Sequence, residues 1–385
     1  MQPIVSIVKC EDYSQERVNE RVRQAIELAE LGSEFAPGKR VLLNPNLLSS
    51  RLPDEAVTTH PSVVEALGRL ALDSGCEVTL GDSPPFAGEN PANYARLCER
   101  TGMTAVARHL GVPVVRFEDE VVKVDNPEGR FYRAFELAGA VVSSDLIVNI
   151  PKLKTHGLTA FSGAVKNVFG CIPGIRKGLF HVQAAENREV FAQMLVDLLR
   201  CVKPAINIMD AVVGMDGEGP NAGGRKPIGL ILASSDPIAL DAVACRIVGI
   251  EPMSVHTTRL ADEQGLGVGR LDAIEIMGEP IESVFVSDFR ESSGANDWAR
   301  IPAPIRRMLR GQLVASPVVN AAECIGCGDC ARVCPIHTIT PGWPPAIDLT
   351  PCIRCYCCQE VCNAKAIHLR RGWMGNLAMK WMAKK

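Results

Sequence analysis

Two cysteine runs near the C-terminus carry the most specific chemistry in this sequence of 385 residues. The first run occupies 324–334 and the second occupies 352–362. In both runs the cysteines have the spacing C-x2-C-x2-C-x3-C. Three thiolates at this spacing bind three irons of one cubane 4Fe-4S cluster, and the fourth cysteine ligates the cluster of the other run. The two runs therefore predict two clusters that exchange one ligand.

The expected ligand sets follow from this exchange. One cluster would be held by Cys324, Cys327, Cys330 and Cys362. The other would be held by Cys352, Cys355, Cys358 and Cys334. Structural zinc sites use short cysteine pairs or cysteine with histidine, and a disulfide scaffold needs an oxidising compartment. Two complete runs of four cysteines fit neither of these classes.

The second run is the irregular one. Asn363 stands where the first run has Pro335, and Cys357 adds a thiol beside Cys358. The proline shapes a turn and is not a ligand, so its replacement removes no cluster. Cys357 is either a bystander or an alternative ligand. We expect the cluster of the second run to be the more unusual or labile of the two.

Composition and charge narrow the class of protein. The hydrophobic share of 47% is sufficient for a large core, and the formal net charge of −3 gives no general signal for nucleic acid. The N-terminus lacks a basic region followed by an apolar stretch, and no run reaches about 18 apolar residues. We expect neither a signal peptide nor a transmembrane segment. A reducing cytoplasm suits the thiols and the clusters.

The elements that must position this chemistry alternate between strands and helices over 1–292. The apolar pattern predicts strands over 4–8, 41–43, 77–80, 114–117, 146–150, 206–209, 228–233 and 273–277. Helices are predicted between them, for example over 187–199 and 237–248. Such alternation indicates an α/β fold, a layered and mostly parallel sheet. A small ferredoxin-like α+β unit with two clusters would follow it.

Four segments are expected along the chain. Residues 1–292 would form the α/β domain that binds substrate, 293–318 a linker, and 319–370 the two-cluster domain. The segment 371–385 is a basic amphipathic tail with interleaved tryptophan and methionine. This tail either packs on the protein or on a second subunit, or it binds a membrane surface or a partner. A homo-oligomer is compatible with the sequence.

A cationic group of residues follows the predicted strand 146–150. In open parallel sheets, ligands bind beyond the carboxyl ends of the strands. Polar residues at such ends give the expected substrate-binding set: Asn46, His60, Asp82, Ser83, Lys152, Lys154, His156, Lys166 and Asn167. The lysines would hold a carboxylate or phosphate. His156 and Lys154 are the candidate catalytic residues, as proton donors.

Structural alternatives exist for these residues. The lysines would otherwise be solvated or would pair with Asp82, Asp210 or Glu218. His60 would otherwise cap the helix that follows it. The loop Gly214–Pro220 is either a plain surface loop or a cover or metal chelator for the site.

Fingerprints of other cofactors are missing from the sequence. Gly265–Gly269 does not have the G-x-G-x-x-G spacing, and no P-loop lysine motif occurs. Nicotinamide, flavin and ATP sites are therefore unsupported. The remaining histidines are isolated in the sequence and receive no role: His109, His181, His256, His337 and His368.

Several motifs of the N-terminal part resemble those of one family. They are Leu43–Asn46, Thr59–Pro61, Gly81–Pro84, Asn149–His156, Gly163–Gly170 and Asp236–Asp241. The chain resembles the bacterial and archaeal domain-of-unknown-function 362 family, whose members often carry a C-terminal two-cluster ferredoxin domain. Asn44 stands where the family commonly has lysine, so a cationic role is not carried over to it. The resemblance implies the domain division and the clusters more than a reaction.

Three functional hypotheses follow. In the first, the chain is an iron–sulfur oxidoreductase that passes electrons from the clusters to a small anionic substrate or cofactor in the α/β domain. In the second, it is an electron carrier or assembly protein that docks a separate redox partner protein and catalyses nothing. In the third, the α/β domain is a non-redox enzyme and the clusters are structural or regulatory.

Overall fold

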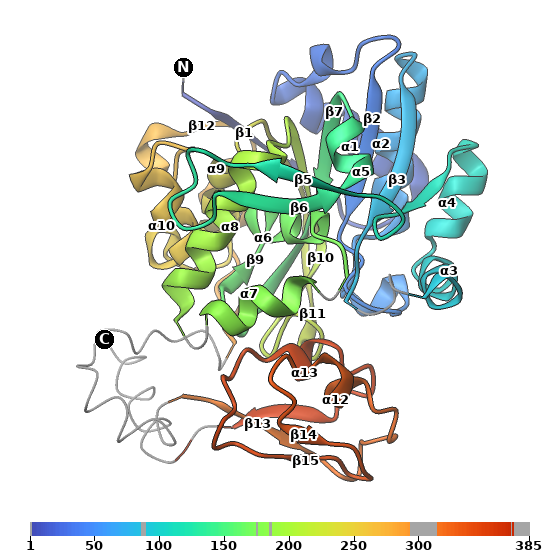
Figure 1. The fold of residues 1–385 in the computed structure, drawn as a ribbon. Coiled ribbons are helices and arrows are strands. Elements are labelled where there is room, and N and C mark those ends of the chain that lie inside the picture. Colours follow the sequence, from blue (N-terminus) through green and yellow to red (C-terminus); the bar gives the residue numbers. More distant parts are fainter. Residues whose placement is uncertain are drawn as a thin grey trace.

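The computed structural model describes residues 2–85, 90–174, 176–184, 187–292, 314–370 and 372. A large α/β domain contains the N-terminal part of the chain, and a small unit made from the C-terminal cysteine region lies against one end of it (Figure 1). Residues 293–313 of the expected linker and all of the expected tail except Gly372 lie outside the described residues.

The large domain is built on one mixed sheet. Its main path runs in the order β12-β1-β11-β10-β7-β2-β3-β4. All these strands are parallel except β11, which is antiparallel to both of its neighbours. The predicted α/β class is confirmed. The strands are β1 (Ile4–Lys9), β2 (Arg40–Pro45), β3 (Glu77–Asp82), β4 (Val114–Arg116), β7 (Leu146–Ile150), β10 (Ile206–Asp216), β11 (Gly224–Ser234) and β12 (Glu275–Gly278).

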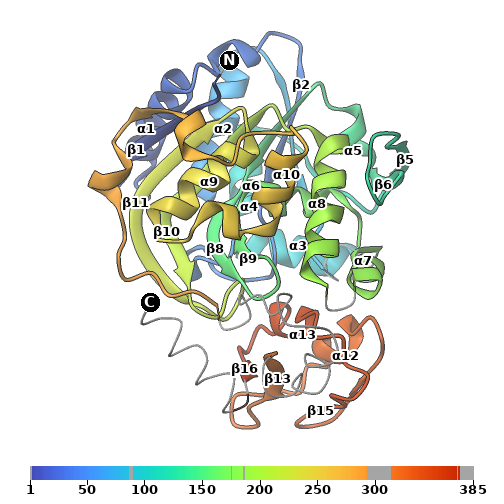
Figure 2. The same cartoon turned by 90° about the vertical axis from the view of Figure 1, so that its left-hand side faces the viewer.

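Helices cover both faces of this sheet (Figure 2). This arrangement explains why the central strands read as apolar runs: all five residues of β7 are buried. One face packs against α1 (Gln15–Leu28), α2 (Pro61–Asp73), α3 (Pro91–Arg100) and α4 (Met103–Leu110). The other face packs against α5 (Gly139–Ser143), α6 (Ala164–Asn167), α8 (Arg188–Val202), α9 (Pro237–Ile247) and α10 (His256–Glu263).

A strand that the apolar pattern does not predict follows β7. Residues Lys152–His156 form β8, which pairs with β10 on one side and with β9 (Ala160–Ser162) on the other. All five residues of β8 are buried although three of them carry lysine or histidine side chains. Gly214–Asp216, expected in a loop, belongs instead to β10, which is extended because β11 continues to pair with it. A second unpredicted pair, β5 (Val121–Asp125) and β6 (Ala134–Ala138), lies outside the main sheet.

The C-terminal unit is small and irregular. Its outer strands β13 (Ser316–Val319) and β16 (Ile367–Arg370) are antiparallel, and β14 (Ile339–Thr340) pairs with β15 (Ala346–Ile347). Two short helices, α12 (Asp329–Val333) and α13 (Cys357–Glu360), lie on the side that faces the large domain (Figure 1). Because β13 begins at Ser316, this unit includes the end of the segment expected to be a linker.

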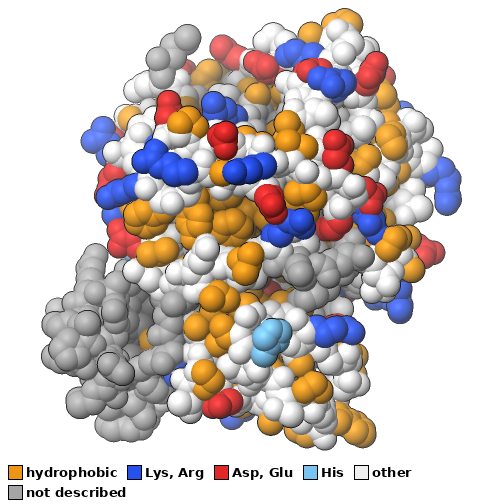
Figure 3. All heavy atoms as spheres, in the orientation of Figure 1, with side chains coloured by type: hydrophobic (Ala, Val, Ile, Leu, Met, Phe, Trp, Pro, Cys, Tyr) orange, Lys and Arg blue, Asp and Glu red, His pale blue; other side chains and the backbone are white. Residues whose placement is uncertain are grey.

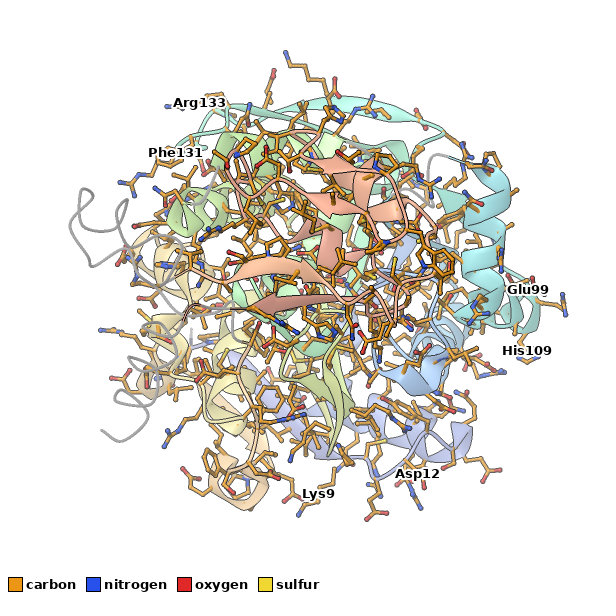
Figure 4. All side chains as sticks on the ribbon, turned by 90° about the horizontal axis from the view of Figure 1, so that it is seen from below. Lys9, Asp12, Glu99, His109, Phe131 and Arg133 are labelled. Atoms are coloured by element: carbon orange, nitrogen blue, oxygen red, sulfur yellow. The ribbon has the colours of Figure 1, made fainter. Side chains whose placement is uncertain are left out.

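The C-terminal unit covers the end of the large domain at which polar residues follow the parallel strands. Seen from that end, it lies over the middle of the domain, and labelled residues such as Lys9, Glu99 and His109 lie around the rim (Figure 4). Hydrogen bonds join the large domain to the C-terminal unit. Asn221 donates to the carbonyl of Cys362 at 3.3 Å, and Gln359 donates to the carbonyl of Glu218 at 2.9 Å.

Short helix α6 is held in place by a buried carboxylate on α9. Asp241 accepts hydrogen bonds from the backbone N–H groups of Ala164 at 2.6 Å and Val165 at 3.0 Å. Gly163, immediately before the helix, has no side chain to obstruct this contact: a Cβ atom there would lie 2.1 Å from Asp241 Oδ1. Asp241 thereby fixes the backbone that carries Lys166 and Asn167.

Replacing Gly163 with alanine is expected to destabilise the protein. The added methyl group would displace the Asp241 carboxylate from a site that is fully packed, at a cost of about 1–3 kcal/mol in the free energy of unfolding. Thermal or urea unfolding of the purified protein measures this. Gly32→Ala is the matched control, because no atom lies within 4 Å of a Cβ atom built at Gly32. Equal stability of both variants and the wild type would contradict the packing described here.

Candidate functional site

A cavity of about 340 Å³ lies where the two parts of the chain meet, along the seam visible in Figure 3. It is large enough for a small metabolite. Seven of the nine expected substrate residues line it: Asn46, Asp82, Ser83, Lys154, His156, Lys166 and Asn167. The C-terminal unit contributes the opposite wall, including Arg332, Cys334, Pro335, His337, Cys357 and Glu360. The cavity therefore needs both parts of the chain.

A chain of four asparagine side chains leads from the sheet to this cavity. Asn149 donates to Asn207 at 2.9 Å, and Asn167 donates to Asn149 at 2.8 Å. Asn46 donates to Asn167 at 2.9 Å, and the last amide oxygen, that of Asn46, accepts from Lys154 Nζ at 2.6 Å. Each amide in this series orients the next. The Lys154 ammonium is consequently fixed by Asn46, which directly follows β2, and through it by residues of β7, β10 and α6.

Lys154 is buried, and no carboxylate among the described residues pairs with it. Its Nζ atom also donates to the carbonyl of Val57 at 2.7 Å, so both hydrogen-bond acceptors are neutral. Burial, and then the positive charges of Lys166 and Lys152, lower the pKa of Lys154 to about 7. A lysine with this pKa exchanges its proton readily at neutral pH.

Lys166 presents its charge to the cavity in a different way. Its Nζ atom lies 4.6 Å from the ring centroid of Phe169 and 5.9 Å from that of Phe191, which is a cation–π arrangement. Within the described part of the chain it makes no hydrogen bond or ion pair. Burial lowers the pKa of Lys166, and the acidic groups Glu360 and Asp82 oppose this effect. Its donors remain available to an anion in the cavity.

Asp82 and Ser83 form the floor of the cavity together with Lys177 of α7 (Arg176–Ala184), which sequence reasoning missed. Lys177 Nζ donates to the Ser83 carbonyl at 2.7 Å and to Ser83 Oγ at 3.0 Å. Asp82 accepts from the backbone N–H of Leu47 at 2.8 Å. Burial raises the pKa of Asp82 to about 6 although Lys177 opposes the rise, and burial lowers the pKa of Lys177 to about 8.

His156 faces a carboxylate supplied by the C-terminal unit. Its Nδ1 accepts from the backbone N–H groups of Leu158 at 3.0 Å and Thr159 at 3.4 Å, so the ring proton resides on Nε2. Nε2 lies 3.2 Å from Glu360 Oε1, but no hydrogen bond joins them, and within the described residues neither atom has another hydrogen-bond partner. Burial lowers the pKa of His156 and raises that of Glu360. Both atoms are thus available to a ligand.

Two expected substrate residues, Lys152 and His60, do not line this cavity. Lys152 Nζ is bonded to Asp210 Oδ2 at 2.8 Å and to the hydroxyl of Tyr13 at 2.7 Å. His60 stacks on Tyr13 at 3.6 Å and accepts from the N–H of Ser62 at the start of α2. Both residues have the structural role given above as the alternative: Lys152 forms an ion pair and His60 caps a helix. Lys152 forms this pair because the Asp210 carboxylate neutralises its buried charge.

The cysteines of the two runs gather into two groups. One small cavity is lined by Cys324, Cys327, Cys330 and Cys362. Another is lined by Cys334, Cys352, Cys355 and Cys358. Backbone N–H groups point to the sulfurs, as from Thr338 to Cys334 at 3.3 Å and from Ala366 to Cys362 at 3.2 Å. Four convergent thiols with N–H donors fit iron–sulfur ligation.

Several residues of the main cavity were not singled out by the sequence. His181 is isolated in the sequence, Glu360 stands within the second cysteine run, and the sequence alone makes Cys357 either a bystander or an alternative cluster ligand. No local pattern marks Glu360 or His181, because their proximity arises only when the two parts of the chain pack together. The unusual position of Cys357 beside Cys358 was a signal that could have been followed. Asp216, which lies in β10 and not in a loop, forms an ion pair with Arg290 at 2.7 Å.

Comparison with known proteins identifies both parts of the chain. Residues 41–246 match the family model described as a domain of unknown function, DUF362, and residues 316–363 match a 4Fe-4S dicluster domain. A thylakoid-associated protein, sll1697, of Synechocystis sp. (strain ATCC 27184 / PCC 6803 / Kazusa) is 30% identical over 281 residues. This match covers 73% of the present chain and 85% of the relative. The expected family and iron–sulfur binding are therefore confirmed.

Solved structures are more distant. The lactate racemase apoprotein from Thermoanaerobacterium thermosaccharolyticum has a TM-score of 0.39 and 15% identity, over 62% of this chain and 55% of that chain. A protein from Thermotoga maritima has a TM-score of 0.33 and 15% identity, over 54% of this chain and 52% of that chain. Both matches thus span about half of the solved chains. In the described part of the chain, no helix is long and apolar enough to cross a bilayer.

Anion binding in the cavity should depend on pH. Lys154 carries its charge below its pKa of about 7 and loses it above, so affinity for sulfate, whose charge is constant here, should fall as pH rises. For one such group the loss is about tenfold between about pH 6 and about pH 8. Calorimetric titration with sulfate at several pH values measures this. Lys154→Met should bind weakly with a flatter profile, whereas Lys9→Met, at an exposed site, should retain the wild-type profile. A flat wild-type profile would show that Lys154 does not titrate in this range.

Proposed function

The chain belongs to the DUF362 family, and from this premise we propose that it is an iron–sulfur oxidoreductase which passes electrons to a small anionic substrate bound in the cavity between its two parts. The 4Fe-4S domain supports an electron-transfer role. The finer assignment, substrate reduction in the cavity, rests on one observation. Lys154, His156 and Lys166 line the same cavity as Cys334 and Cys357 of the C-terminal unit.

The residues of the cavity suit distinct tasks. Lys166, whose ammonium makes no hydrogen bond or ion pair with the described residues, would bind a carboxylate or phosphate of the substrate. Lys154 would give a proton to the reduced product, because a pKa of about 7 matches a general acid to neutral pH. His156 would donate its Nε2 proton in a hydrogen bond to a substrate oxygen and so orient it. Glu360 would balance the charge of these cations.

We propose two clusters, with the ligand sets given by the two groups of cysteines. When bound, they would supply single-electron transfer from the exposed side, where Cys327 lies, to the buried group that borders the cavity through Cys334. Cys327 is exposed and Cys324 is partly so, whereas Cys334, Cys352, Cys355 and Cys358 are all buried. The exposed group is therefore the natural point of contact for a redox partner protein.

We further propose that the protein works in a reducing compartment such as the cytoplasm. The support comes from the six cysteines other than the eight expected cluster ligands and Cys357. All six are free thiols in the structure. Five of these six are buried. They behave as small apolar side chains rather than as a disulfide framework.

The two-cluster assignment predicts the iron content. Anaerobically reconstituted protein should contain about eight irons per chain, and Cys327→Ser and Cys334→Ser should each lose part of this iron or change the EPR spectrum of the reduced protein. The control Cys201→Ser removes a thiol that is remote from both groups and should leave iron content unchanged. About four irons per chain in the wild type would rule out the two-cluster assignment.

The proposed reaction predicts substrate-dependent reoxidation. Protein reduced under anoxia and then mixed with a panel of small carboxylates and oxyanions should be reoxidised by at least one of them, which is followed by the visible absorbance. Replacing Lys166 with methionine removes a cation of the cavity and should slow this step about thirtyfold or more, with iron content retained. Lys9→Met should react like the wild type.

The same experiment distinguishes the oxidoreductase hypothesis from the carrier hypothesis. Reduced protein that no small acceptor in the panel reoxidises, but that reduces an added redox protein at a rate unaffected by Lys166→Met, would contradict catalysis in the cavity. It would favour a carrier that serves a separate enzyme.

A further inference from the structure

A group of metal-ligating side chains lies on the wall of the cavity next to the second cysteine run. One donor atom from each of His181, Cys355 and Cys357 lies within 4.8 Å of the other two. His181 comes from α7 of the large domain, and both cysteines come from the C-terminal unit. The group therefore forms only where the two parts of the chain meet.

The His181 imidazole is held in position, but one of its ring nitrogens lacks a hydrogen bond within the described residues. Its ring stacks on Phe191 at 4.6 Å and meets the edge of Phe169 at 5.8 Å. The side chain is 5% exposed, and its Nδ1 atom has no hydrogen-bond partner within the described residues. A buried polar atom without a partner is destabilising, and structural histidines normally avoid this by forming a hydrogen bond. An aromatic clamp that fixes an unpartnered nitrogen is what a preorganised ligand requires.

We propose that His181, Cys355 and Cys357 bind a mononuclear divalent metal ion of borderline softness, Zn²⁺ or Fe²⁺, on the cavity wall. Two thiolates and one imidazole are the donor set that such ions prefer. In a tetrahedral site with metal–sulfur bonds of about 2.3 Å and metal–nitrogen bonds of about 2.0 Å, the donors lie roughly 3.5–3.8 Å apart. Small side-chain movements close the gap from the present arrangement.

Cys355 would be shared under this proposal. It belongs to the group of four cysteines that includes Cys334, Cys352 and Cys358, and its sulfur also contacts that of Cys357. Its thiolate would bridge the cluster and the mononuclear ion. Cys357 does not line the small cavity of that group but does line the large one. The extra thiol of the irregular run thereby gains a role that is distinct from cluster ligation.

The fourth coordination position of the ion would face the cavity. Both His181 and Cys357 line it, and Lys166, which lies against Phe169, is on the same side. Two thiolates offset the charge of this ammonium. Three protein ligands with one open position are typical of catalytic rather than structural metal sites. The ion would therefore contact an oxygen of a bound carboxylate or of water.

The test uses Co²⁺ as a spectroscopic probe in the full-length, cluster-loaded protein under anoxia. Equilibrium dialysis should find one Co²⁺ per chain beyond the cluster iron, with the ligand-field bands of tetrahedral cobalt. His181→Ala and Cys357→Ser should each weaken this binding about tenfold or more. Cys201→Ser, which removes a thiol outside the site, should bind like the wild type.

His181→Ala carries the decision, because His181 lies outside the cysteine runs and its loss should leave iron content and the cluster EPR signal intact. Binding by His181→Ala equal to that of the wild type would overturn the proposal. So would the absence of Co²⁺ uptake, or uptake with an octahedral spectrum that no variant changes, which is an adventitious ion only. The readout is metal binding, so it is independent of whether reoxidation of the reduced protein succeeds.

Discussion

The full or partial burial of three lysine side chains, where the large domain meets the C-terminal unit, is the constraint on which the rest of the site depends. Lys154 and Lys177 are buried and Lys166 is half-buried at the end of the sheet, and loss of hydration is the largest cause of the lowered pKa of each. Transferring an ammonium group out of water is costly unless other groups replace the hydration. Each lysine meets this requirement differently: with amide and carbonyl oxygens, with aromatic rings, or with a serine.

This constraint explains why the site is made from two parts of the chain. Asp82 and Glu360 are the acidic groups that favour the charged forms of Lys177 and Lys166, and Glu360 comes from the C-terminal unit. Without that unit the lysines would be hydrated and their pKa values would return toward ordinary ones. The cavity, the lowered pKa of Lys154 and the proximity of the cysteines therefore arise together, from one interface. An isolated α/β domain would retain the residues but not their electrostatics.

The sequence predicts most of the main sheet from the pattern of apolar residues and the cysteine groups from the cysteine spacing. It predicts most of the cavity from the polar residues that follow the strands. It does not separate Lys152 from Lys154, because both follow the same buried strand. The structure shows why they differ: Lys152 stands opposite Asp210 of β10, whereas Lys154, two residues further along β8, stands opposite Met215. Lys152 therefore pairs with Asp210 of the neighbouring strand, while Lys154 and His156 line the cavity. Glu360 and His181 could not be predicted, since no local pattern brings together α13 and α7.

The irregular second cysteine run lies where the C-terminal unit packs against the large domain. Tyr356, immediately before α13, has a left-handed backbone with φ of 62°, which is strained for a residue with a side chain. Its ring packs in the core of the large domain beside Gly157, where a Cβ atom would lie 3.2 Å from the ring. Burial of the ring offsets the strain. This backbone turn directs Cys357 and Glu360 to the cavity instead of to the small cavity of the four cysteines. Cys357, the extra thiol of the irregular run, thus lies on the cavity that the C-terminal unit shares with the large domain.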